Sequence, residues 1–156
     1  MNRDAALRQQ VVKLMESSEA HAEFEDAVEA FPEQLRGKRP DGCPHSPWQL
    51  LEHMRIAQWD ILEFTRDPKH HSPDFPDGYW PADPEPPDAD AWGKTVKAFL
   101  ADRRELCELV MDDSVDLFAK IPHGDGQTFL RQALLTADHN AYHLGQLLLL
   151  RRTFGA

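Results

Sequence analysis

Cysteine is scarce in this sequence. The 156 residues include only two, Cys43 and Cys107, and they lie far apart in the chain. This pattern does not resemble a disulfide framework, which needs several cysteines in a short chain, or a zinc site built from closely spaced cysteine pairs. We therefore expect two reduced thiols, either of which can serve as an ordinary buried side chain.

Long apolar runs are also missing. No stretch approaches the roughly 20 uncharged apolar residues of a membrane span, and the segment Met1–Leu7 lacks the apolar core of a secretory signal. These absences exclude a membrane-spanning helix and favour the cytoplasm as the protein's location.

Basic residues are outnumbered. The chain has 17 Lys and Arg against 27 Asp and Glu, which gives a formal net charge of −10. Proteins that bind DNA or RNA need a basic surface to neutralise phosphates, so a nucleic-acid partner is not expected. The sequence also lacks Gly-x-Ser-x-Gly, His-Glu-x-x-His and a phosphate-binding glycine loop, which removes the common nucleophile, zincin and nucleotide motifs.

Apolar residues recur at helical spacing, and no segment shows the sustained alternation of a strand. The sequence therefore predicts an all-α fold, a four-helix bundle formed by residues 1–156 as a single domain. We predict a first helical region from Asp4 to Ala30, broken or kinked at Ser17-Ser18 because serine favours helix caps. The other predicted helices cover 46–66, about 88–111, and about 128 to just before Gly155.

The second helix has the clearest start. Ser46-Pro47-Trp48-Gln49 combines an N-cap serine, a proline at the first helical position and a glutamine at the third, which is a capping box. Asp67-Pro68 predicts its end. The following stretch, Pro68–Pro87, holds seven prolines and the aromatic residues Phe75, Tyr79 and Trp80. We expect a long crossover loop that packs against the helices and helps to shape a pocket.

Two histidines one helical turn apart, His139 and His143, are the first candidate for chemistry. Their spacing lets both imidazoles reach one ion, although eight histidines in 156 residues would give such a pair by chance roughly a third of the time. A helical wheel places the pair on a polar seam of the last helix. The seam consists of Gln132, Thr136, His139, His143, Gln146 and Leu150.

The opposite side of the last helix is apolar, and a small bundle offers it few partners within one chain. We therefore expect a homodimer interface there. The residues of this predicted interface are Leu130, Leu134, Ala137, Ala141, Leu144 and Leu148.

His53 is the third candidate ligand, because the wheel of the second helix turns it inward together with Leu50, Ala57 and Asp60. The same wheel places Gln58 outside this inward face. Two helices packed 8–10 Å apart can bring one histidine to a pair on the other. A lone histidine on an apolar face is more often a hydrogen-bonded core residue than a ligand, but three inward histidines favour a metal site. The loop histidines His70, His71 and His123 are expected to be solvated.

Four further residues are candidates for the surroundings of the ion or for the pocket. Asp60 lies two turns from His53, too far to share its ion, and must hold a partner or orient a group in the pocket. Gln146, one turn after His143, can accept a hydrogen bond from an imidazole N–H and fix the tautomer of that ring. Tyr142 and Trp48 are candidates for lining the pocket.

The segments Trp48-Gln-Leu-Leu-Glu-His53 and His139-Asn-Ala-Tyr-His143-Leu-Gly-Gln146 resemble the DinB/YfiT-like family of metal-dependent enzymes. The resemblance in helix order covers essentially the whole chain. It implies a four-helix bundle, commonly dimeric, with a nickel, zinc or iron ion bound by His53, His139 and His143. Some members carry a further histidine where this chain has Tyr142.

Two functions are compatible with these residues. The first is a metal-dependent enzyme that hydrolyses a small substrate or transfers a low-molecular-weight thiol, since proteins similar to this family include hydrolase-like proteins and thiol-dependent transferases. The second is a non-catalytic helical dimer that binds a metal or small ligand, or uses its histidines structurally. The sequence identifies no general base.

Overall fold

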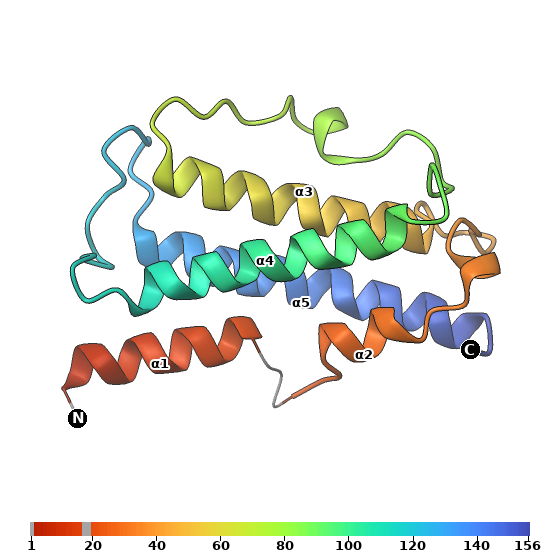
Figure 1. The fold of residues 1–156 in the computed structure, drawn as a ribbon, viewed down its shortest axis with the longest axis horizontal. Helices are drawn as coiled ribbons and strands as arrows, with labels where there is room; N and C mark the ends of the chain where they lie inside the picture. The colour runs from red at the N-terminus through yellow and green to blue at the C-terminus, as the bar shows by residue number, and fades with distance from the viewer. Residues whose placement is uncertain (1, 17–19) are drawn as a thin grey trace.

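The computed structural model describes residues 2–16 and 20–156, and every regular element in this part of the chain is helical (Figure 1). The prediction of an all-α chain is confirmed, and the only β pairing among the described residues is an isolated bridge between Lys120 and Thr128. The elements are α1 (Arg3–Glu16), α2 (Phe24–Glu29), α3 (Pro47–Arg66), α4 (Ala91–Met111) and α5 (Phe129–Thr153), with the short 3-10 helices η1 (Glu33–Leu35) and η2 (Asp77–Tyr79).

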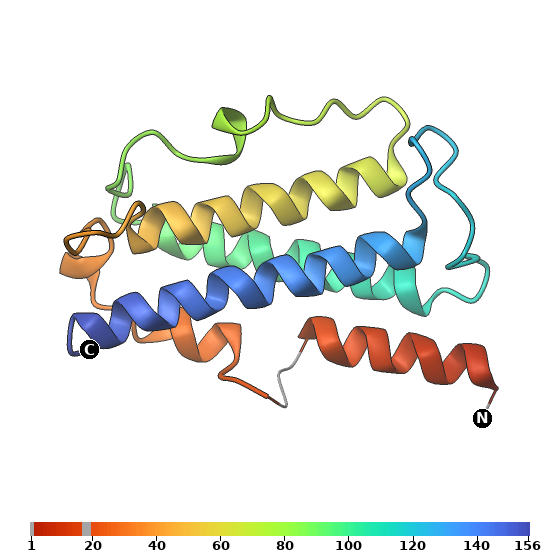
Figure 2. The same cartoon turned by 180° about the vertical axis from the view of Figure 1, so that it is seen from behind.

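The three long helices α3, α4 and α5 run alongside one another, and α1 and α2 follow each other along the opposite side from α3 (Figures 1 and 2). Helix α1 packs against α4 and α5. Helix α2 packs against α5, and its Phe24 ring stacks on Phe99 of α4. Residues 67–90 connect α3 to α4 and run along α3 on the side away from α1 and α2, with η2 in contact with α3.

The predicted capping box of α3 is present. The backbone N–H of Gln49 donates to Ser46 Oγ at 3.2 Å, and the backbone N–H of Ser46 donates to Gln49 Oε1 at 3.1 Å. The same two side chains also bind the long connection, because Ser46 Oγ donates to the Pro84 carbonyl at 2.6 Å and Gln49 Nε2 donates to the Pro81 carbonyl at 3.0 Å. The first turn of α3 therefore fixes where this helix begins, and it also holds the connection between α3 and α4 at Pro81 and Pro84.

The N-terminal helical region differs from the prediction of one region over residues 4–30. Helix α1 ends at Glu16 and α2 begins only at Phe24, with non-helical backbone over residues 20–23. The break predicted at Ser17-Ser18 lies outside the described residues. The two helices lie roughly end to end rather than side by side (Figure 2).

A buried glutamine links the three long helices. Gln58 Nε2 donates to the Phe99 carbonyl of α4 at 2.7 Å, and Gln58 Oε1 accepts from Asn140 of α5 at 2.9 Å. The helical wheel placed Gln58 outside the inward face, and this was wrong. Helix α3 is buried against both α4 and α5, so its buried arc is wider than a single apolar stripe.

The two cysteines are free thiols, as expected. Cys107 is buried, and this burial raises the pKa of its thiol to about 12, which keeps it protonated at neutral pH. Among the residues that the structure describes, no helix combines the length and apolarity needed to cross a membrane.

Arg8 joins α1 to the end of α4. Its buried guanidinium donates to the carbonyls of Val110 at 2.7 Å, Asp112 at 2.9 Å and Val115 at 2.6 Å, and it pairs with Asp4. A cation at a helix C-terminus satisfies carbonyls that have no partner within the helix and is attracted by the helix dipole. The arginine thus fixes where α4 ends.

We predict that Arg8→Ala lowers the free energy of unfolding by about 3 kcal/mol, because it leaves three carbonyls without their charged donor. Urea denaturation of the purified variant measures this loss. Arg3→Ala, which truncates an exposed arginine of the same helix, is the matched control and should change stability by less than about 0.5 kcal/mol. Equal effects of the two substitutions would contradict the role assigned to Arg8.

Candidate metal centre

Three histidines from two helices converge at the contact between α3 and α5. His53 comes from α3, and its Nε2 lies 3.1 Å from Nε2 of His139 and 3.1 Å from Nε2 of His143, both on α5. The candidate ligand atoms of the three rings all lie within 4.8 Å of one another, and His53 and His143 are buried. The structure therefore brings together the three residues that the sequence analysis proposed as ligands.

Helix geometry explains this convergence. His139 and His143 are one turn apart on α5 and project from the same face. The α3 capping box sets where the second turn of α3 lies and thereby turns His53 toward the pair. The buried seam of α5 continues to either side of the histidines with Gln132, Thr136 and Leu150.

Hydrogen bonds on the far side of two rings determine where their protons lie. His53 Nδ1 is 2.9 Å from the Tyr79 carbonyl oxygen, which can only accept, so Nδ1 carries the proton. His143 Nδ1 likewise donates to Gln146 Oε1 at 2.7 Å, which is the role that the sequence analysis proposed for Gln146. A neutral imidazole has a single N–H, so Nε2 of both rings presents a lone pair to the centre of the cluster.

The three rings are neutral at physiological pH. Burial lowers the pKa of His53 to about 4, and the Tyr79 carbonyl only partly opposes this effect. Burial also lowers the pKa of His139 to about 4, with the neighbouring His143 adding to the shift and Asn140 opposing it. The pKa of His143 is lowered for the same first reason. Neutral imidazoles are the form that binds metal ions.

A wall of stacked aromatic rings closes one side of the cluster. Trp80 lies flat on His53, with ring centroids 3.7 Å apart and an interplanar angle of 4°. His45 stacks on Trp80 with centroids 3.8 Å apart, and the edge of Trp80 meets His143. Trp80 and Tyr79 belong to the connection between α3 and α4, so this segment contacts the cluster, whereas Phe75 of the same segment is exposed.

Asp60 does not reach the cluster but binds the segment that lines it. Its Oδ1 accepts from His70 Nε2 at 2.7 Å and its Oδ2 accepts from the Tyr79 hydroxyl at 2.7 Å. The prediction that His70 is solvated was wrong, because its side chain is only 8% exposed. The inward position of Asp60, which requires a buried partner, was the one sequence signal that could have pointed to His70.

The remaining candidates lie in different surroundings. Trp48 is buried in the apolar core with Phe31 and Trp92, and it is Trp80 that stacks on His53. Tyr142 is 65% exposed, and its ring lies edge-on to His143 with centroids 4.8 Å apart. Tyr142 therefore borders the cluster on its solvent side.

The sequence matches the DinB superfamily over residues 16–147, which include all three histidines. This chain is a member of the DinB superfamily. Comparison with the curated proteins found no match, and comparison with the solved structures found none either.

The donor set of this DinB-superfamily chain suits a divalent ion. Imidazole nitrogen is a ligand for zinc, nickel and iron alike. Two nitrogens bound tetrahedrally to one zinc ion at about 2.1 Å lie about 3.4 Å apart, close to the 3.1 Å separations of His53 Nε2 from its two neighbours. The three histidines can therefore hold a metal ion.

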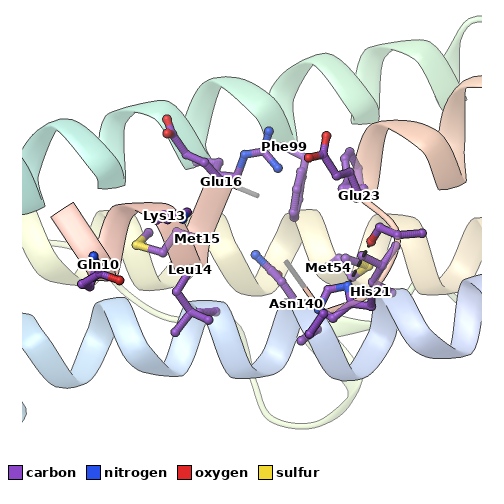
Figure 3. A pocket seen from close by; sticks show the side chains of 17 residues that line it. Gln10, Lys13, Leu14, Met15, Glu16, His21, Glu23, Met54, Phe99 and Asn140 are labelled. Carbon is purple, nitrogen blue, oxygen red and sulfur yellow. Dashed lines mark hydrogen bonds between the residues drawn. The ribbon is translucent and has the colours of Figure 1, made fainter. Parts of the chain in front are cut away.

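A separate cavity of about 230 Å³ lies where α1 ends and α2 begins (Figure 3). Met54, Phe99 and Leu144 contribute to its apolar lining, and Asn140 borders it. Met54 and Asn140 directly follow His53 and His139 in sequence, and adjacent helical residues point about 100° apart. The cavity consequently lies on another side of these helices than the histidine cluster, and we do not assign it to the metal centre.

Proposed function

We propose that this protein is a metal-dependent enzyme whose divalent ion is bound by His53, His139 and His143. The observation that carries the proposal is the convergence of the three Nε2 atoms, two of which belong to rings whose Nδ1 proton is bound on the opposite side. Membership in the DinB superfamily supports it. The metal is proposed to be zinc, nickel or iron, since imidazole ligands suit all three.

Three neutral protein ligands are typical of catalytic rather than structural zinc sites, because they leave the ion its full charge and an open position. An ion in such a site can lower the pKa of a water molecule toward 7 or bind a thiolate. We therefore propose either hydrolysis of a small substrate or transfer of a low-molecular-weight thiol as the reaction.

The residues around the ligands orient and shield them in this proposal. The Tyr79 carbonyl and Gln146 hold the Nδ1 protons and direct the lone pairs inward. Trp80 covers one face of His53 and excludes water there. The exposed ring of Tyr142 marks the side from which a small substrate would approach.

The second candidate is a non-catalytic protein that binds a metal or small ligand. The stack in which His45 packs on Trp80 and Trp80 packs on His53 supports it, because a closed site binds an ion without admitting a substrate.

We predict that protein purified without a histidine tag binds about one zinc or nickel ion per chain after dialysis, whereas His143→Ala retains less than about 0.2. The loss follows from removing one of three ligands. Elemental analysis and titration calorimetry measure it, and circular dichroism verifies that the variant is folded. His71→Ala, at an exposed position in the same protein, is the control and should bind as the wild type does. Binding that survives His143→Ala would refute the ligand set.

We further predict that a thiol gains access to the ion. Adding 2-mercaptoethanol to the cobalt-loaded protein should produce a near-ultraviolet sulfur-to-metal absorption band, because three protein ligands leave a position open. The loaded protein should then either hydrolyse p-nitrophenyl acetate or accelerate the reaction in which the glutathione thiolate displaces chloride from 1-chloro-2,4-dinitrobenzene. An unchanged spectrum together with no turnover would favour the binding protein.

We also propose that α1 and α2 jointly fill one position of a four-helix bundle and that two chains pair through α5. Ala137 and Leu144 of the predicted interface are buried within the chain, so only part of that face is free. Two leucines of α5 are exposed, Leu134 at 44% and Leu149 at 63%. They lie on one side of the helix, and this stripe is the proposed dimer contact.

Analytical ultracentrifugation should give the mass of a dimer for the wild type and of a monomer for Leu149→Glu, since a buried charge in an apolar contact is costly. Phe118→Glu places the same charge at another exposed apolar residue and should remain dimeric. A monomeric wild type would contradict the proposed pairing.

A further inference from the structure

Asp60 is a buried carboxylate whose hydrogen-bond partners lie in the connection between α3 and α4 rather than on a neighbouring helix. It lies in α3, and both of its oxygens accept hydrogen bonds from residues of the connection between α3 and α4. Burying a carboxylate costs free energy unless strong hydrogen bonds compensate for the lost water. The Tyr79 hydroxyl and His70 Nε2 provide two such bonds, each 2.7 Å long. Asp60 therefore fixes the position of the segment at two points.

Tyr79 connects this carboxylate to the metal centre. Its hydroxyl donates to Asp60 Oδ2, and its backbone carbonyl accepts from His53 Nδ1 at 2.9 Å. The Tyr79 hydroxyl is the donor in this bond, because an ionised carboxylate oxygen can only accept. One residue is thus held at its side chain by Asp60 and holds His53 with its backbone.

The next residue reinforces the same ring. Trp80 follows Tyr79 and stacks on the face of His53. The segment therefore contacts His53 both in the plane of the ring, at Nδ1, and above that plane. Any movement of residues 79 and 80 would release both contacts together.

We propose that Asp60 is a positioning residue of the metal centre, which acts through Tyr79 to hold the His53 ring with its proton on Nδ1 and its Nε2 lone pair directed at the ion. The link is mechanical: a proton cannot pass from the tyrosine hydroxyl to the backbone carbonyl of the same residue along hydrogen bonds. Asp60 does not touch the ion or a substrate. This inference rests on the proposed metal function, but part of its test needs no metal.

The first experiment is carried out on the metal-free protein. The ¹⁵N chemical shifts of the His53 ring at pH 7 identify which nitrogen carries the proton. We expect Nδ1–H in the wild type and a substantial population of Nε2–H in Tyr79→Phe, which removes only the hydroxyl, and in Asp60→Asn. An unchanged Nδ1–H tautomer in both variants would overturn the inference, even if their melting temperatures fell.

The second experiment measures affinity for Co²⁺. Loss of an orienting partner typically costs 10–100-fold in metal affinity, and because Asp60 acts at one remove we expect about tenfold for either variant. The double variant should be weaker than the single variants by less than about twofold, because both substitutions break the same connection. Asp113→Asn removes an exposed carboxylate elsewhere and should retain wild-type affinity.

The outcomes separate the two claims. Wild-type affinity in both Tyr79→Phe and Asp60→Asn would show that Asp60 only stabilises the loop, and would overturn the inference while leaving the metal centre intact. A wild-type protein that binds no Co²⁺ would refute the proposed function, and the tautomer measurement would still decide whether Asp60 orients His53.

Discussion

The site depends on keeping three imidazoles neutral, with the Nε2 lone pairs of His53 and His143 directed at one point. Burial alone would not achieve this, because a buried ring can place its proton on either nitrogen. The Tyr79 carbonyl holds the proton of His53 on Nδ1, and the Gln146 side chain holds the proton of His143 on Nδ1. The Nε2 lone pairs of His53 and His143 face each other at 3.1 Å and repel each other unless a cation lies between them.

The connection between α3 and α4 is part of the site rather than a simple crossover. Ser46 and Gln49 bind its carbonyls at Pro84 and Pro81, and Asp60 binds the hydroxyl of Tyr79. Its residues Tyr79 and Trp80 in turn contact His53. The helices bring the ligands together, and the connection sets the orientation of His53. The hydrogen bonds from Ser46, Gln49 and Asp60 explain why this proline-rich segment packs along α3.

The parts of the structure that follow from local sequence were predictable. The ends of α3 and α5 are marked by caps, and the wheel of each helix turned His53, His139 and His143 inward. The path of the connection was not predictable, because it depends on contacts with α3. A backbone carbonyl such as that of Tyr79 leaves no trace in the residue pattern, and His70 looked like an ordinary loop histidine. Gln58 was misplaced because the wheel assumed one packing partner where α3 has two.

The most direct test of the metal centre is an anomalous-diffraction map of crystals of the zinc-loaded protein, recorded at the zinc absorption edge. The account predicts one strong peak about 2.1 Å from Nε2 of His53, His139 and His143 alike, with a further position on the ion unfilled by protein. A peak bound through Nδ1 of any of these rings, or no peak between them, would contradict it.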